Sequence, residues 1–172
     1  IGVMAIQMAR VAGAAKIFAT AGTGEKCQIA SSLGATRAID YKTEDFAEVV
    51  RAEGGADVIL DMVGGDYIQK NISAANPDGR IINIAYQNGF QATINFAPVL
   101  MKRLTLAATT LRARPLPEKK RIRDAVEADF WPHVANGTIL PVLHKVFPAA
   151  EAEQAHQLMA SGTHIGKILI SW

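Results

Sequence analysis

Hydrophobic and polar positions along the chain follow two alternating patterns. Short apolar runs rich in β-branched residues predict strands, and longer stretches with apolar residues three or four positions apart predict helices. Strands are expected over residues 16–20, 37–40, 56–62, 80–85 and 104–111. Helices are expected from the first residues to Gly13 and over residues 24–33, 45–52, 66–75 and 96–102. This alternation, with its short connections, predicts a parallel sheet covered by helices on both faces.

Three of these segments carry sharper expectations. Residues 56–62 form a nearly continuous apolar run, which predicts a strand buried on both faces. Met4, Met8 and Val11 share one face of the first helix, so that face is expected to pack on the core. Pro77-Asp78-Gly79 has the composition of a turn before the strand that follows it.

The pattern changes near Arg112-Ala113-Arg114-Pro115-Leu116-Pro117, where prolines among charged residues fit a crossing between domains. After the crossing we expect helices over 118–135 and 149–159 and strands over 140–146 and 167–172. These elements are too few for a core of their own. Residues 1–112 are therefore predicted to form one domain, and residues 113–172 a returning segment that completes a second, catalytic domain whose main part is missing.

Charge and composition exclude several classes of partner. The 172 residues are 49% hydrophobic and 20% charged, with a formal net charge of +2. Acidic and basic residues are interspersed, so neither nucleic acid nor a membrane surface is an expected partner. The basic run from Lys119 to Arg123 is followed by acids and is interpreted as a solvated helix face. No segment reaches the ~20 uninterrupted apolar residues of a membrane helix.

Cysteine and histidine usage argues against a metal centre. Cys27 is the only cysteine, so neither an internal disulfide nor a cysteine zinc cluster is possible, which suits a cytoplasmic protein. The histidines lie far apart without the spacing of metal ligands and are interpreted as structural or surface residues. They are His133, His144, His156 and His164.

The start of the chain has the character of a phosphate-binding turn running into a helix. In a dinucleotide fold the last glycine of the Gly-rich turn lets the helix pack closely on the sheet. Gly2 is the candidate for that glycine, whereas the earlier glycines and the first strand are absent from the sequence. The predicted fold is α/β, a doubly wound, Rossmann-like parallel sheet that lacks its first strand.

The end of the second expected strand of that fold indicates which nucleotide is bound. NAD enzymes place an acid there to hold the ribose 2′-hydroxyl, but Phe18 to Thr23 contains none. Gly22 and Thr23 offer hydrogen-bond donors, and Lys26 offers a cation for a 2′-phosphate, which favours NADP over NAD. With Thr23 as the N-cap, Lys26 lies at the third helical position and opposes the helix dipole. The alternative is a flexible, exposed lysine without a partner.

Other residues at expected strand ends are candidates for cofactor contact, because ligands meet an open parallel sheet at that edge. Gly64-Gly65 follows residues 56–62, and Asn88-Gly89 follows residues 80–85. Backbone contact with a ribose or nicotinamide and an ordinary tight turn both explain such glycines. Tyr41 follows residues 37–40, either as an adenosine contact or as a surface tyrosine.

Catalytic residues are left unassigned. The chain has no serine nucleophile elbow, and Asp40 and Asp61 lack an evident acid–base partner in the sequence. Hydride transfer does not demand such a partner, because the nicotinamide carries the chemistry and the protein positions it.

Short motifs that are weak singly become specific through their order and spacing. They are Ile1-Gly2-Val3 through Gln7, Ala21-Gly22-Thr23 through Lys26, Leu33-Gly34-Ala35, Asp40-Tyr41-Lys42 with Glu44-Asp45-Phe46, Asp61-Met62-Val63-Gly64-Gly65, Asp78-Gly79-Arg80, Leu111-Arg112 and Ile165-Gly166-Lys167-Ile168. With these motifs the whole chain resembles the C-terminal half of the quinone oxidoreductases of the medium-chain dehydrogenase/reductase superfamily. It is most similar to the zeta-crystallin-like and p53-inducible quinone reductase branch.

The resemblance implies a zinc-independent NADPH:quinone reductase that acts on a small-molecule quinone, and it assigns cofactor contacts by position. Gly22, Thr23, Lys26 and Tyr41 are implied at the 2′-phosphate end, Val63 and Gly64 at the ribose, Ala85, Tyr86 and Gln87 near the nicotinamide, Leu111 and Arg112 closing over it, and Gly166 and Lys167 completing the cleft. Family members commonly dimerise through an edge strand of the cofactor domain, which implies a homodimer through residues 104–110.

Two other functions stay open. An NADPH-dependent enoyl or enone reductase shares this half of the protein, and the shape of the acceptor pocket discriminates the two. Alternatively, the chain by itself is a fragment that binds a nucleotide without catalysing a reaction, because it lacks the first strand and most of the phosphate turn.

Overall fold

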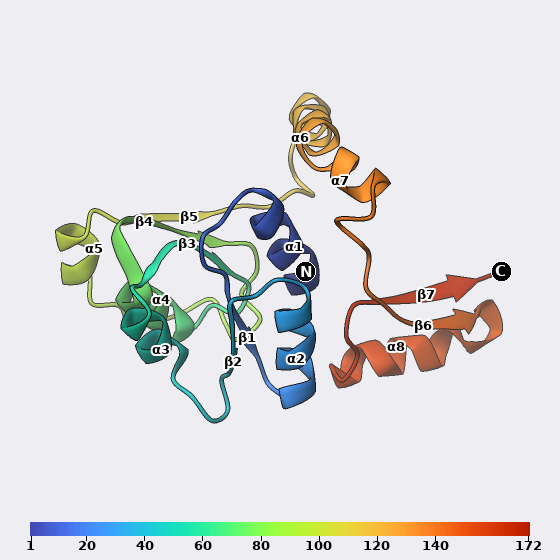
Figure 1. Ribbon diagram of the computed structural model, residues 1–172, viewed down its shortest axis with the longest axis horizontal. Helices are drawn as coiled ribbons and strands as arrows, with labels where there is room; N and C mark the ends of the chain where they lie inside the picture. Colours follow the sequence, from blue (N-terminus) through green and yellow to red (C-terminus); the bar gives the residue numbers. More distant parts are fainter. The chain divides into compact units, whose positions relative to one another are not determined.

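The computed structural model describes residues 1–172, in which helices and strands alternate along most of the chain (Figure 1). The strands are β1 (Phe18–Ala21), β2 (Arg37–Asp40), β3 (Ala56–Asp61), β4 (Ala75–Asn83), β5 (Thr105–Ala108), β6 (Leu143–Pro148) and β7 (Lys167–Ser171). The helices are α1 (Gly2–Val11), α2 (Gly24–Ser32), α3 (Phe46–Ala52), α4 (Tyr67–Ala74), α5 (Ala97–Met101), α6 (Leu116–Asp129), α7 (Trp131–Ala135), the 3₁₀ helix η1 (Ala149–Glu151) and α8 (Ala152–Ser161).

The chain forms two compact units, which are described in turn. Residues 39–122 make one unit, and residues 1–38 together with 123–172 make the other. Strand β1 pairs with β2 in a two-stranded sheet. No helix is long and apolar enough to cross a membrane.

The unit of residues 39–122 is built on a three-stranded parallel sheet in the order β3-β4-β5. Helices α3 and α4 lie against each other, and the rings of Phe46 and Tyr67 stack across them with centroids 5.2 Å apart. The core contains Ile72, Ala75 and Ile81, with Ile59, Ile68, Ile94, Val99 and Leu104 packed around them. The parallel α/β architecture expected from the sequence is therefore confirmed.

Strand β3 is less buried than its apolar sequence predicts. Ile59 packs against the core cluster, whereas its neighbours Val58 and Leu60 are 56% and 49% exposed. Successive side chains of a strand point to opposite faces, so packing on one face leaves the other set in contact with solvent. The expectation of a strand buried on both faces is not met in this chain.

The predicted turn at residues 77–79 lies inside β4 as an irregularity. Ala56 of β3 pairs with Ala75, but Val58 already pairs with Arg80, so β4 accommodates the extra residues between them. Asp78 takes a φ of +61°, and its N–H donates to the carbonyl of Lys102 at 2.7 Å. The turn and the strand are both present because the strand bulges at the turn.

In the other unit, helix α1 packs on a different face from the one predicted. The core cluster contains Ile6, Ile17, Ala30 and Ala35, and the second buried residue of α1 is the polar Gln7. The methionines of the predicted face are only half-buried. Gln7 is buried because its amide meets the backbone of Leu140, donating to the carbonyl and accepting from the N–H at 2.9 Å each.

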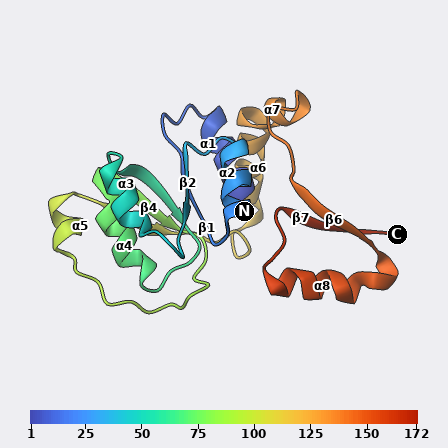
Figure 2. The ribbon, with the colours of Figure 1, turned by 60° about the horizontal axis from the view of Figure 1, so that its bottom comes forward.

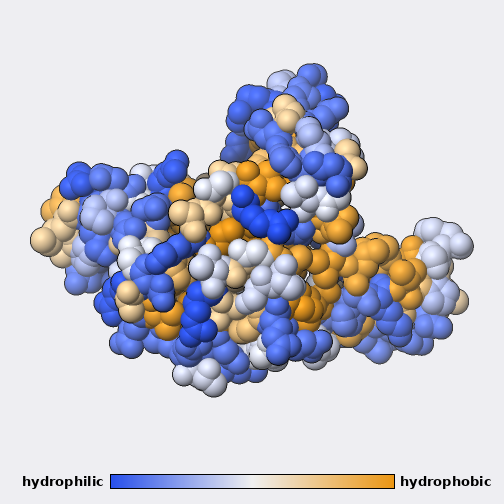
Figure 3. All heavy atoms as spheres, viewed as in Figure 1, coloured by the Kyte–Doolittle hydropathy of each residue, from blue (hydrophilic) through white to orange (hydrophobic).

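The remainder of this unit consists of the helices and strands after residue 122. The helix predicted over 118–135 divides into α6 and α7 at Phe130, because Pro132 lies in the first turn of α7 and cannot continue a preceding helix. Strands β6 and β7 pair in parallel, and α8 runs beside them (Figure 2). Apolar side chains gather on the surface over β6 and β7 (Figure 3), among them Leu143, Val146, Leu169 and Ile170.

Candidate cofactor-binding site

The carboxyl ends of β3 and β4 carry two loops that are hydrogen-bonded to each other along their length. The N–H groups of Gln87 and Asn88 donate to the carbonyls of Met62 and Val63 at 3.1 and 2.7 Å. The N–H of Gly65 donates back to the carbonyl of Gly89 at 3.1 Å. Loop 62–65 and loop 84–89 therefore form one fixed edge of the sheet.

Gly64 and Gly65 are required by this contact between the loops. Both have positive φ, +69° and +53°. A Cβ on Gly64 would lie 2.6 Å from a ring carbon of Tyr86, and a Cβ on Gly65 would lie 2.8 Å from the carbonyl oxygen of Asn88. The glycine pair thus has a reason within the protein itself, which the sequence interpretation as a tight turn anticipated in part.

Asp61, at the end of β3, anchors the same edge from inside. Its side chain is a buried acceptor of three N–H groups, those of Val63 at 2.7 Å, Gly64 at 3.3 Å and the Asn83 side chain at 2.7 Å. Asp61 is 4% exposed and Asn83 is 7% exposed. The sequence offered no partner for Asp61. The only local signal for Asn83 is a polar residue in the apolar strand sequence RIINIA.

A pocket of about 350 Å³ opens at the carboxyl ends of β4 and β5. It is lined by residues 83–86 and 108–110, which include the predicted nicotinamide-side residues Ala85 and Tyr86. Arg114 folds back on its rim, donating to the Thr109 hydroxyl at 2.8 Å and to the Thr110 carbonyl at 3.0 Å. Nothing in the sequence assigns Asn83, Thr109 or Arg114 to this edge.

The segment predicted to close over the nicotinamide follows the pocket directly. Leu111 is 57% exposed, and the carbonyl of Arg112 accepts a hydrogen bond from the Lys119 ammonium at 2.8 Å. Lys119 belongs to the basic run that was interpreted as a solvated face, and in the structure it also holds the backbone of this segment.

The predicted 2′-phosphate residues lie at the start of α2. Thr23 is the N-cap, as predicted, and its hydroxyl accepts from the Lys26 N–H at 3.2 Å. The Lys26 ammonium donates to the carbonyl of Gly162, the left-handed residue that ends α8. The partner of the Lys26 ammonium is therefore a backbone carbonyl, which carries no net charge. Tyr41, at the end of β2, is 46% exposed.

The remaining predicted contacts are divided between the two units. In the unit of residues 39–122, the fixed edge formed by loops 62–65 and 84–89 carries five of them: Val63, Gly64, Ala85, Tyr86 and Gln87. Gly2, Gly22, Thr23, Lys26, Gly166 and Lys167 belong to the other unit. Gly2 begins α1 with open space around its Cα, whereas Gly166, at φ +88°, is confined by the backbone of Val142.

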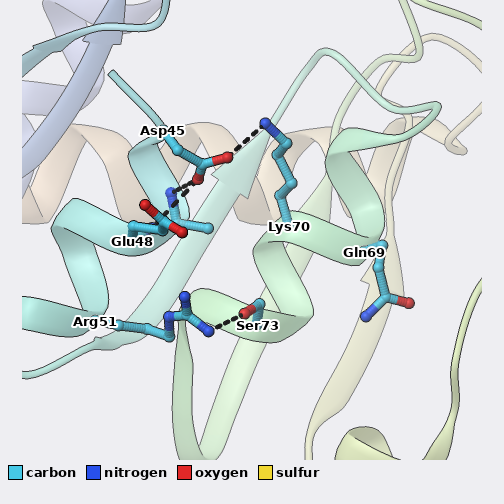
Figure 4. A pocket seen from close by; sticks show the side chains of 7 residues that line it. Asp45, Glu48, Arg51, Gln69, Lys70 and Ser73 are labelled. Atoms are coloured by element: carbon cyan, nitrogen blue, oxygen red, sulfur yellow. Dashed lines mark hydrogen bonds and ion pairs between the residues drawn. The ribbon is translucent and has the colours of Figure 1, made fainter.

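A second groove, of about 270 Å³, lies between α3 and α4 and away from the strand ends (Figure 4). The Lys70 ammonium contacts the Asp45 carboxylate at 2.8 Å, and Arg51 reaches the Ser73 hydroxyl at 3.0 Å. The hydrogen bond from Lys70 lowers the pKa of Asp45, and Asp45 raises the pKa of Lys70. Since Asp45 pairs with Lys70 and Arg51 binds Ser73 across the two helices, we interpret this groove as a structural contact.

The arrangement at the strand ends suits a dinucleotide cofactor. No three histidine, cysteine, aspartate or glutamate side chains lie close enough together to hold a metal ion. Parallel strands that end at a pocket, together with a capped helix after β1, are the features with which an open α/β sheet binds nucleotides. Fold and site define a protein of the Rossmann-like NAD(P)-binding class.

Comparison with known proteins gives the family. Residues 1–128 match the model of the zinc-binding dehydrogenase family, and the chain belongs to that family. It is 30% identical to 2-haloacrylate reductase of Burkholderia sp. over 91% of this chain and 48% of that protein. It is 32% identical to a phenolphthiocerol/phthiocerol polyketide synthase of Mycobacterium tuberculosis over 99% of this chain and 8% of that protein.

A solved structure supports the same placement. The quinone oxidoreductase of Thermus thermophilus, whose complex with NADPH is also known, superimposes with a TM-score of 0.85 at 26% identity. The match covers 99% of this chain and 54% of that chain. The chain thus spans about half the length of that enzyme and of the haloacrylate reductase, and a much smaller share of the polyketide synthase.

Proposed function

We propose that this chain is the NADPH-binding part of an oxidoreductase that reduces quinones without zinc. The observation that carries the proposal is the pocket at the carboxyl ends of β4 and β5, lined by Ala85 and Tyr86 beside the locked Gly64-Gly65 turn. The likeness to an NADPH-binding quinone oxidoreductase supports it. Bound NADPH supplies a hydride, and the protein positions the nicotinamide and excludes water.

In this proposal the residues of the chain have separate tasks. The backbone of Val63 and Gly64 faces the ribose, Ala85, Tyr86 and Gln87 face the nicotinamide, and Leu111 with Arg112 closes over it. Gly22, Thr23, Lys26 and Tyr41 hold the 2′-phosphate end, while Gly2, Gly166 and Lys167 complete the cleft. Residues 1–112 form the cofactor domain, and residues 113–172 return to the catalytic domain.

Lys26 provides the test of NADPH over NADH. The turn after β1 contains no acid before Glu25, and Lys26 contacts only a neutral carbonyl, so its charge is available to a 2′-phosphate. We expect calorimetric titration to give tighter binding of NADPH than of NADH. We also expect Lys26→Ala to weaken NADPH binding by roughly tenfold, the size of one charge-assisted contact, and to leave NADH binding unchanged.

NADH serves as the control ligand, because Lys26→Ala also removes the hydrogen bond to Gly162. A structural effect of that loss weakens both cofactors alike, whereas a phosphate contact weakens NADPH alone. Equal affinity of the wild-type chain for both cofactors contradicts the 2′-phosphate assignment. The absence of any binding contradicts the proposal that this chain binds the cofactor by itself.

An enoyl or enone reductase is the second candidate, and the haloacrylate reductase relative favours it. A haloacrylate presents a carbon–carbon double bond next to a carboxylate, so its reduction also needs a hydride delivered to a conjugated system. To distinguish the two candidates, the rate of NADPH oxidation by the whole protein is measured with a flat quinone and with a 2-enoyl thioester at the same NADPH concentration.

We also propose a cytoplasmic homodimer. Strand β5 is the outer strand of the β3-β4-β5 sheet, and all four of its residues are exposed. An exposed sheet edge is a template for pairing with another strand, and a second copy of β5 satisfies it symmetrically. The single cysteine suits a reducing compartment.

A further inference from the structure

We propose that the buried Asp61 carboxylate makes this site bind the oxidised cofactor more tightly than the reduced one. The inference rests on the proposed function, because it concerns the nicotinamide end of the same pocket. It assigns Asp61 the role of a positioning residue whose charge is felt by the bound ring, with Asn83 as its partner.

The hydrogen bonds of Asp61 suit a negatively charged carboxylate. Every partner donates to it: the backbone N–H groups of Val63 and Gly64 and the side-chain amide of Asn83. Backbone N–H groups cannot accept a hydrogen bond in return, so the contacts with Val63 and Gly64 suit a negatively charged carboxylate. Its donors are all neutral groups, and no ion pair involves Asp61, so the negative charge is not cancelled locally.

Asp61 reaches the pocket through Asn83. Asn83, whose side-chain amide lies 2.7 Å from the Asp61 carboxylate, is one of the residues that line the pocket, together with Ala85 and Tyr86. Asp61 is 4% exposed, so little water lies around it to screen its field. A buried charge beneath a pocket wall acts on whatever charge the pocket accepts.

The two states of the cofactor differ in charge at the nicotinamide ring. The ring is neutral in NADPH and carries one positive charge in NADP⁺, while the phosphate groups are the same in both. With the nicotinamide in this pocket, the uncancelled Asp61 carboxylate would favour NADP⁺ over NADPH, with an effect on the order of tenfold in relative affinity. A site with this preference also stabilises the positive charge that develops during hydride donation.

A purely structural role for Asp61 predicts a different outcome. Asp61 also fixes the turn of residues 62–65, so its loss disturbs the pocket in any case. A disturbed pocket binds NADP⁺ and NADPH less tightly by the same factor. The ratio of the two affinities therefore separates the effect of the charge from the effect on shape.

The test measures the affinities of the chain for NADP⁺ and NADPH by calorimetry. Asp61→Asn removes the charge at constant shape, and Asn83 keeps the hydrogen bond by turning its amide over. We expect this variant to lose about tenfold in NADP⁺ affinity relative to NADPH affinity. Should it fail to fold, as judged by circular dichroism, Asp61→Ser, whose hydroxyl can still accept from the Val63 N–H two residues on, removes the charge as well and makes the same prediction.

The exchanged pair, Asp61→Asn with Asn83→Asp, is the matched control. It restores one carboxylate and one amide in the same contact, and we expect it to restore the wild-type affinity ratio. Equal weakening of both cofactors in the neutral variants, or an unchanged ratio, overturns the inference while leaving the proposed function standing. A wild-type chain that binds neither cofactor overturns the proposed function, and the inference fails with it.

Discussion

The two turns that the sequence singles out for cofactor binding are held in place in different ways. The turn of residues 61–65 is fixed from inside by the buried Asp61 carboxylate and by four hydrogen bonds to the neighbouring strand end and loop. The turn of residues 23–26 has one capping hydrogen bond, at 3.2 Å, and a half-buried Lys26 whose ammonium donates to the Gly162 carbonyl. The first turn is part of the core, and the second is part of the surface.

This difference separates positioning from selectivity. A turn that shares hydrogen bonds with the core cannot change without a cost in stability, because buried polar groups lose their partners. A lysine held by one exposed hydrogen bond to a neutral carbonyl exchanges that partner for another at little cost. We therefore expect substitutions around residues 61–65 to destabilise the fold, and substitutions at Lys26 to change only the choice of nucleotide.

The largest effect is expected for Gly64→Ala. The new Cβ would meet Tyr86 at 2.6 Å and the Gly89 carbonyl at 3.0 Å, in a backbone conformation with φ +69°. The left-handed conformation and the overpacking together cost roughly 2–4 kcal/mol. Denaturant unfolding measures this loss of free energy.

The control for Gly64→Ala is Gly24→Ala in the other turn. Gly24 has open space where its Cβ would lie, and it is the first residue of α2. We expect that variant to be neutral or more stable by up to about 1 kcal/mol, because alanine is the better helix former. Similar losses at the two glycines would contradict the distinction between the two turns.

A second, smaller effect tests whether the unit with the exposed turn also has a buried polar contact. Gln7→Ala removes the paired hydrogen bonds to Leu140 and leaves the backbone N–H and carbonyl of Leu140 without partners. Unsatisfied backbone groups cost roughly 1–3 kcal/mol. Thermal unfolding monitored by circular dichroism at one pH is the measurement.

Arg10→Ala, on the same helix, is the comparison for Gln7→Ala. Its guanidinium donates to the Thr138 carbonyl at 2.9 Å, but that contact is exposed. Water replaces a lost exposed hydrogen bond, so the loss should stay below about 1 kcal/mol. If Arg10→Ala proves as destabilising as Gln7→Ala, burial is not what gives the Gln7 contact its value.

The parts of the fold that the sequence predicts are those with local causes. Strand β2 has the predicted bounds, α2 lies within one residue of its prediction, and Thr23 caps it as expected. Each follows from neighbouring residues: an apolar run, a helical period, a hydroxyl before the first turn. The hydrophobic period alone fails where a second local signal competes with it. It predicts one helix that is too long at Phe130, where Pro132 lies in the first turn of a new helix, and a strand that begins too late at residues 77–79, where a turn lies inside β4.

The parts that the sequence does not predict depend on partners far along the chain. Gln7 and Leu140 are 133 positions apart, and Asp61 and Asn83 are 22 positions apart. A buried amide or carboxylate is indistinguishable from a surface one until its partner is known. Ala85 and Tyr86, which the family resemblance places near the nicotinamide, line the pocket at the ends of β4 and β5, but the polar residues that fix this edge were not predicted.

The smallest expected effect concerns the Asp45–Lys70 ion pair between α3 and α4, a surface contact like that of Lys26. The hydrogen bond from Lys70 lowers the pKa of Asp45, so its stabilisation is complete above the ordinary carboxyl pKa of about 3.9. It is lost as the pH falls through the lowered value. For Lys70 the pKa is raised, so the direction is reversed. The stabilisation that the ion pair gives through Lys70 is complete below about pH 10.4, the ordinary lysine pKa, and is lost as the pH rises further.

Asp45→Asn isolates this pair, because asparagine keeps the N-cap acceptor for the N–H groups of Ala47 and Glu48 and removes only the charge. Both partners are more than a third exposed, so screening reduces the expected loss to about 0.5 kcal/mol or less at pH 7. Stability measured from pH 7 down to pH 2 should show the variant and the wild type converging. Glu48→Gln removes a charge from the same helical turn and leaves the Lys70 contact intact, so it should retain the wild-type dependence on pH. If the stability of Glu48→Gln also converges with that of the wild type at low pH, the loss of stability in acid comes from the net charge of the helix. The ion pair would then contribute nothing of its own.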